Sequence, residues 1–131
     1  DPNGLRDDFE YFKNMGINMA LDDFGTEYSS IALLRKLKPQ WIKIDHTFVR
    51  SIQDDEMDQA ILEYIMNLSK QTRIKVCVEG VENKEILSVV QTYKPELLQG
   101  YYYSRPCPAE EFSKKYFNGK DKTGSYGCLK K

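Results

Sequence analysis

Short apolar segments alternate with amphipathic segments along this chain, and that alternation limits the folds open to it. Helical periodicity, with apolar residues three and four positions apart, predicts helices in the intervening stretches. The predicted strands are residues 17–21, 41–44, 74–78 and 97–102. The predicted helices are residues 5–15, 31–37, 56–70 and 84–92, and one that begins near Pro108 and carries Phe112, Tyr116 and Phe117. Strands separated by helices in this way indicate an α/β fold with a parallel sheet covered by helices.

Two architectures are compatible with four such strands: a doubly wound open sheet, or part of a (β/α)8 barrel. A complete barrel needs about 250 residues, and this chain has 131. The segment from Asn118 to the end is rich in Gly and Lys, so we expect residues 118–131 to form a flexible tail.

Composition excludes several classes of protein. The formal net charge is -1, so no basic excess points to a DNA or RNA polymer as partner. No apolar run approaches the roughly 20 residues of a membrane span. The three cysteines are an odd number at wide spacing, which indicates reduced thiols and a cytoplasmic location.

Polar side chains lie within the last part of the predicted strands or directly after them. The set comprises Asp22, Asp23, Lys43, Asp45, Glu79, Glu82 and Gln99. Successive strands of a parallel sheet end on the same side, so these side chains are expected to converge on one rim. Single acidic residues at strand ends are also ordinary helix caps, but the whole set favours a metal site. Crowded carboxylates repel one another unless cations bind, and all-oxygen ligands suit Mg²⁺ or Mn²⁺.

The chemistry expected at such a rim is displacement at a phosphodiester. Two divalent ions can activate a water molecule and stabilise the attacking and leaving oxygens of an in-line displacement. A neighbouring lysine, here Lys43, could orient that water or neutralise a phosphate oxygen.

Four motifs, in order, resemble one known family. Residues 21–30, LDDFGTEYSS, are similar to its DDFGTGYSS loop, and residues 43–45 match its KID motif. Residues 79–82 match EGVE, and residues 99–106, QGYYYSRP, are similar to its QGY-FS-P ending. On these residues the chain resembles the EAL family of cyclic di-GMP phosphodiesterases, over roughly residues 5–117.

The resemblance implies the C-terminal half of a TIM-like (β/α)8 barrel, with residues 1–117 as the C-terminal portion of an EAL domain. It also implies hydrolysis of cyclic di-GMP to linear pGpG with Mg²⁺ or Mn²⁺. Glu79 and Lys43 would be catalytic, as general base and as contact to the attacking water. The implied metal site comprises Asp22, Asp23, Asp45 and Glu82, and Gln99, Glu27 and Arg105 are assigned to substrate contacts or support.

Two departures from the family pattern suggest an alternative to an active phosphodiesterase. The Glu-Ala-Leu signature is not in this sequence, and Glu27 stands where the family has glycine. We therefore expect this chain alone to be inactive. The parent protein is expected to be either an active phosphodiesterase or, as the alternative, an EAL-type module that does not hydrolyse its ligand. Such a module would bind cyclic di-GMP or a protein. An open half barrel exposes two strand edges and an apolar inner layer, so we also expect this chain to self-associate. The resemblance is compatible with GGDEF, sensory or membrane-anchoring domains elsewhere in the parent.

Overall fold

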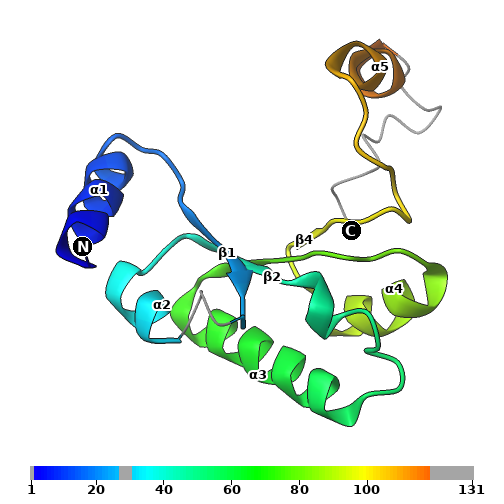
Figure 1. Ribbon diagram of the computed structural model, residues 1–131, viewed down its shortest axis with the longest axis horizontal. Coiled ribbons are helices and arrows are strands. Elements are labelled where there is room, and N and C mark those ends of the chain that lie inside the picture. Colours follow the sequence, from blue (N-terminus) through cyan, green and yellow to red (C-terminus); the bar gives the residue numbers. More distant parts are fainter. Residues whose placement is uncertain (1, 27–30, 119–131) are drawn as a thin grey trace.

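A single sheet of four parallel strands lies at the centre of the molecule, in the order β1-β2-β3-β4 (Figure 1). The computed structural model describes residues 2–26 and 31–118, with side chains within 4–26 and 31–117. The strands are β1 (Ala20–Phe24), β2 (Trp41–Ile44), β3 (Lys75–Val78) and β4 (Leu97–Leu98). Each strand pairs in parallel with its neighbour, which confirms the predicted sheet.

Helices alternate with the strands, as the sequence predicts. The α-helices are α1 (Pro2–Asn14), α2 (Ile31–Leu37), α3 (Glu56–Thr72), α4 (Lys84–Val90) and α5 (Ala109–Ser113). Two 3-10 turns, η1 (His46–Phe48) and η2 (Gln91–Tyr93), and a π-helical turn, η3 (Lys114–Asn118), complete the described elements. Helices α2, α3 and α4 lie along one side of the sheet (Figure 1).

The core lies between the sheet and these helices, because alternate strand residues face it. On β2 and β3, the residues Ile42, Ile44, Val76 and Val78 are at most 1% exposed. They are in one core cluster with helix residues Leu62, Ile65 and Met66 of α3 and Ile86 and Val90 of α4. The intervening strand residues Trp41 and Lys43 are only half-buried. One face of the sheet is therefore closed by helices, and the other is partly open: Trp41 and Lys43 are half-buried there, while Cys77 of β3, in register with Lys43, is 7% exposed.

The first strand lies three residues later than the sequence predicts, at Ala20–Phe24 instead of 17–21. The preceding helix ends in a left-handed glycine, Gly16 (φ +79°), and the Ile17 amide donates to Phe12 O at 3.1 Å. Ile17 thus belongs to the helix end, in the arrangement of a Schellman cap. Pairing fixes the strand start, because Ala20 is in register with Trp41. As a result, Asp22 and Asp23 lie within the strand instead of after it.

The fourth strand is shorter than predicted, with two residues instead of six, because the chain turns immediately after it. The Gln99 carbonyl accepts from the Val81 amide at 3.1 Å, and the Tyr103 amide donates to Gly100 O at 3.1 Å. Gln99 therefore follows the strand. Tyr101 and Tyr102, which the sequence places in the strand, lie in this turn together with Tyr103.

Helix ends carry the caps that their sequences suggest. The Asp55 side chain accepts from the amides of Met57 and Asp58 at the start of α3, and Asn83 accepts from the Ile86 amide at the start of α4. Of the predicted tail, residues 118–131, Asn118 is the last residue of η3, and residues 119–131 lie outside the described residues, as do Ser29 and Ser30 before α2. None of the described helices has the length and apolar character that a membrane span needs.

Gly100 gives a direct test of how the end of β4 is held. A Cβ at this position would overlap the backbone of Val81, which cannot move without breaking its bonds to Gln99 and Tyr102. We expect Gly100→Ala to lower the free energy of unfolding by about 3 kcal/mol in chemical denaturation. Gly16→Ala is the control: its Cβ meets nothing within 4 Å, so only the left-handed backbone costs energy, about 1 kcal/mol. Equal losses would contradict the close approach.

Candidate metal centre

An irregularity in β1 places two consecutive aspartates on the same side. Leu21 pairs with Ile42 and Phe24 with Ile44, so three steps along β1 match two along β2. Asp23 takes up the extra residue in a left-handed conformation (φ 50°), which aspartate tolerates better than most residues. In a regular strand Asp22 and Asp23 would face opposite sides. The bulge instead leaves both exposed, between the buried side chains of Leu21 and Phe24.

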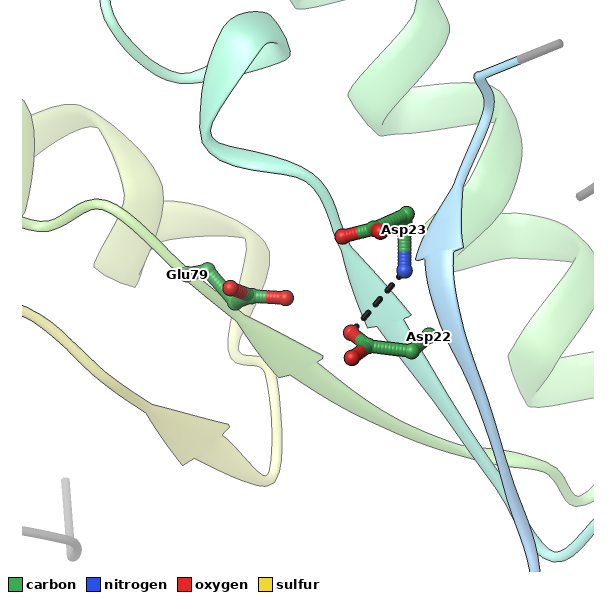
Figure 2. Close-up of side chains that lie close together, drawn as sticks. All are labelled: Asp22, Asp23 and Glu79. Carbon is green, nitrogen blue, oxygen red and sulfur yellow. Dashed lines mark hydrogen bonds between the residues drawn. The ribbon is translucent and has the colours of Figure 1, made fainter. Parts of the chain in front are cut away.

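Glu79 joins this pair from across the sheet. It follows β3 directly, and its amide donates to Ile44 O at 3.1 Å, which extends the β2–β3 ladder to the rim. One carboxylate oxygen from each of Asp22, Asp23 and Glu79 lies within 4.8 Å of the others. Figure 2 shows Glu79 directed toward the two aspartates, with the Asp23 amide donating to Asp22 Oδ1 at 2.9 Å.

Lys43 lies between the acids on the intervening strand. Its Nζ is 3.7 Å from Asp22 Oδ1 and 3.6 Å from Glu79 Oε1. These distances give attraction between opposite charges but are too long for good hydrogen bonds. Glu79 Oε1 is buried and has no hydrogen-bond donor among the described residues. A buried acceptor without a donor is costly, so this oxygen is available to a cation.

The pKa values of Glu79 and Asp22 are shifted in opposite directions. Burial, followed by the neighbouring Asp22 carboxyl, raises the pKa of Glu79, and Lys43 only partly offsets this. Desolvation also acts on Asp22, but hydrogen bonds from the Asp23 amide and Glu79, together with Lys43, outweigh it and lower the pKa of Asp22. Asp22 therefore carries the negative charge first, and Glu79 is the carboxyl that keeps its proton longer.

Asp45 lies beside this cluster and not within it. Its carboxylate is 6% exposed and caps η1, accepting from both the amide and the hydroxyl of Thr47. Burial opposes its ionisation, but the Thr47 hydrogen bonds prevail, and with His46 and the nearby Asp23 side chain they lower the pKa of Asp45. Thr47 was not singled out in the sequence, although an Asp two residues before a Thr at a turn is a recognisable capping pattern.

Glu82 and Gln99 meet Glu79 in a cleft of about 290 Å³. The cleft is also lined by His46 and Tyr101. His46 is the first residue of η1, its side chain is 53% exposed, and its Nδ1 is 3.5 Å from Asp45 Oδ1. The tight packing of Gly80 against His46, where a Cβ would lie 2.6 Å from His46 Cβ, fixes this wall.

Arg105 lies farther along the same rim, in an adjoining cleft of about 310 Å³ that shares Gln99 and Tyr101 with the first. Its guanidinium stacks 4.7 Å from the centre of the Tyr101 ring. Arg105 forms no ion pair among the described residues. Glu27 lies outside the residues that the structure describes.

The residues present fit a divalent cation. The three carboxylates offer only oxygen atoms as metal ligands, which suits hard ions such as Mg²⁺, Mn²⁺ or Ca²⁺ more than Zn²⁺. Glu79 Oε1 is buried and has Lys43 Nζ at 3.6 Å but no donor at hydrogen-bond distance, so a cation that binds it directly would satisfy it better. The cluster unites Asp22, Asp23 and Glu79, while Asp45 and Glu82 stand next to it.

Comparisons with known proteins agree with this geometry. The family model for the EAL domain matches residues 3–106. Cyclic di-GMP phosphodiesterase NbdA of Pseudomonas aeruginosa is 37% identical over 110 residues, 82% of this chain and 14% of NbdA. The chain thus spans about one-seventh of that relative's length.

Solved structures show the same fold. An EAL domain protein from Listeria monocytogenes superposes with a TM-score of 0.81 at 37% identity, over 87% of this chain and 46% of that one. Klebsiella pneumoniae BlrP1, in a manganese and cyclic di-GMP complex, superposes with a TM-score of 0.74 at 35% identity, over 79% and 26% of the two chains. EAL domains have the TIM-barrel fold, which confirms the predicted fold class. The chain belongs to the EAL domain family.

Proposed function

We propose that this chain forms part of a metal-dependent phosphodiesterase that hydrolyses cyclic di-GMP to linear pGpG. The observation that carries the proposal is the cluster of Asp22, Asp23 and Glu79, crossed by Lys43 and containing a buried oxygen without a donor. The name of NbdA and the manganese and cyclic di-GMP complex of BlrP1 support the same substrate and a divalent ion.

Each residue of the rim has a role in this proposal. Asp22, Asp23 and Glu79 would hold Mg²⁺ or Mn²⁺. Asp45 would support Asp23 through the contact between their side chains. When bound, such an ion lowers the pKa of a coordinated water and offsets charge on the phosphate. Lys43 would contact the attacking water or a phosphate oxygen, since its ammonium is held at the rim by two carboxylates.

Proton transfer is assigned to Glu79. A general base works best when its pKa is near the operating pH, and burial raises the pKa of Glu79 in that direction. Glu82 and Gln99 line the adjoining cleft and would position the substrate, with Glu27 and Arg105 in supporting roles.

The proposal extends to the setting of the domain. We assign residues 1–117 to the EAL domain, supported by the match over residues 3–106. Cytoplasmic location is part of the proposal, in line with the free thiols of Cys77 and Cys107. Self-association and GGDEF or sensory domains in the parent remain predictions.

A second candidate is a regulatory module that binds cyclic di-GMP without cleaving it. Glu27 favours this candidate, because the family has glycine at that position of the loop that follows Asp22 and Asp23. The two candidates differ in turnover and agree on binding.

Hydrolysis is the direct test. We expect the full-length protein that carries this domain to convert cyclic di-GMP to pGpG with Mg²⁺ or Mn²⁺, followed by chromatography. Glu79→Gln should lower kcat at least about 100-fold, as expected for loss of a general base, while Glu63→Gln on the exposed face of α3 should not. Tight binding without any pGpG would reject the enzyme in favour of the regulatory module.

Metal binding tests the cluster separately from turnover. We expect Mn²⁺ to bind this chain in a calorimetric titration, with Asp22→Asn weakening the affinity about 10-fold or more, because one of three charged donors is lost. Asp54→Asn is the matched control: Asp54 is exposed and outside the cluster. Equal affinities for both variants would remove Asp22 from the site.

The raised pKa of Glu79 gives a stability prediction for the metal-free chain. The folded state binds this proton more tightly than the unfolded chain, whose pKa is near 4.5. The stabilising effect is fully present below pH 4.5 and is lost as the pH rises through the higher folded-state pKa. The unfolding free energy of Glu79→Gln, relative to the native sequence, should therefore increase between pH 4 and pH 7. A constant difference across that range, measured by denaturant titration, would contradict the raised pKa.

A further inference from the structure

A second concave site lies at the opposite ends of the strands from the metal centre. It is a groove of about 470 Å³ between α2 and the C-terminal part of α3, where the chain enters β2 and β3. In Figure 1 the two helices lie next to each other here. Its apolar lining includes Leu34, Leu68 and Ile74, of which Leu34 is 6% exposed and the other two are half-buried.

Cationic side chains from three separate segments surround this apolar floor. Arg35 comes from the last turn of α2, Lys38 from the loop before β2, and Arg73 from the residue that ends α3. All three are exposed, and none forms an ion pair with a carboxylate in the described part of the chain. Arg35 and Lys38 also line a neighbouring hollow with Arg6. The near-neutral total charge of the chain therefore conceals a local positive region.

These cations lie near the C-terminal ends of two helices, where positive charge interacts favourably with the helix dipole. That role does not require them to surround a groove. Lys94 provides the comparison: it ends η2 in the same left-handed conformation (φ 55°, against 60° for Arg73 and 48° for Lys38). Lys94 lines neither this groove nor its neighbouring hollow. A concave apolar floor with charge at its edge matches a ligand that has both an apolar body and a negative group.

We propose that this groove binds a small amphiphilic anion, an aliphatic carboxylate whose chain lies on Leu34, Leu68 and Ile74. Its carboxylate pairs with Arg35, Lys38 and Arg73. The volume is within the range of small-molecule sites, about 300–1,000 Å³. Guanidinium groups match a carboxylate with two parallel hydrogen bonds, and none of the described residues that line the groove is acidic. This site is independent of the phosphodiesterase proposal.

The test is an NMR titration of the 131-residue chain with hexanoate, octanoate and decanoate below their micelle concentrations. We expect saturable shifts at the amides of Leu34, Leu68 and Ile74. Affinity should increase with chain length, by up to about fourfold for each methylene that is fully buried. Acetate, which has the charge without the chain, should produce no saturable shift at these amides, and 1-octanol, which lacks the charge, should bind at least about fivefold more weakly than octanoate.

Variants distinguish recognition of the carboxylate charge from non-specific hydrophobic binding. The double substitution Lys38→Gln and Arg73→Gln should weaken octanoate at least about tenfold, because two charged hydrogen-bond donors are lost. Lys94→Gln, at a left-handed helix end outside the groove, should leave the affinity unchanged. Both variants alter exposed side chains only, and dispersed amide spectra would verify their folds.

Three results would overturn the proposal. These are equal affinity for octanoate and 1-octanol, unchanged binding in the double variant, or shifts confined to the open face of the sheet around Trp41 and Leu97. Binding of an acidic, leucine-containing peptide with no saturable effect of decanoate would also overturn it, in favour of a protein partner.

Discussion

The bulge at Asp22 and Asp23 is the constraint on which the rest of the site depends. A strand normally directs neighbouring side chains to opposite faces, so two consecutive aspartates could not serve one site without it. The extra residue allows Leu21 and Phe24 to stay buried while both carboxylates remain exposed at the rim. The same irregularity brings Asp23 close to Asp45, which links the cluster to the cap of η1. The bulge, which is stabilised by the packing of Leu21 and Phe24 on either side, thus brings the negative charges of Asp22 and Asp23 together.

That concentration of charge is unfavourable by itself. Lys43 contributes one positive charge to at least three carboxylates, and its distances of 3.6 and 3.7 Å leave the Glu79 oxygen without a donor. The protein tolerates this arrangement because the sheet behind it is closed by fully buried residues such as Ile44 and Val78. A rigid core beneath an incompletely satisfied rim is the usual arrangement of a functional site.

The sequence predicted the elements well where local pattern decides them. Trp41–Ile44 has the bounds expected of it, and α3 begins at Glu56, where the sequence predicts its start. It was less informative where tertiary contact decides. The position of β1 depends on its register with Trp41, and the early end of β4 on the approach of Gly100 to Val81. The rim acids were found because parallel strands end on one side. Which of them converge, Glu79 instead of Asp45 or Glu82, depends on the bulge in β1, which no local pattern specifies, and on the cap that Asp45 makes to Thr47.

The order of the strands has a consequence for how the fold is assembled. Each strand pairs with the one that precedes it in the chain, so no pairing waits for a distant segment. Each parallel pairing still spans a whole helix, which makes it slower to form than a local contact, but each new strand can dock on a sheet edge that already exists while synthesis continues. The same arrangement is modular: a helix-and-strand unit added at either edge lengthens the sheet without rewiring the units already in place.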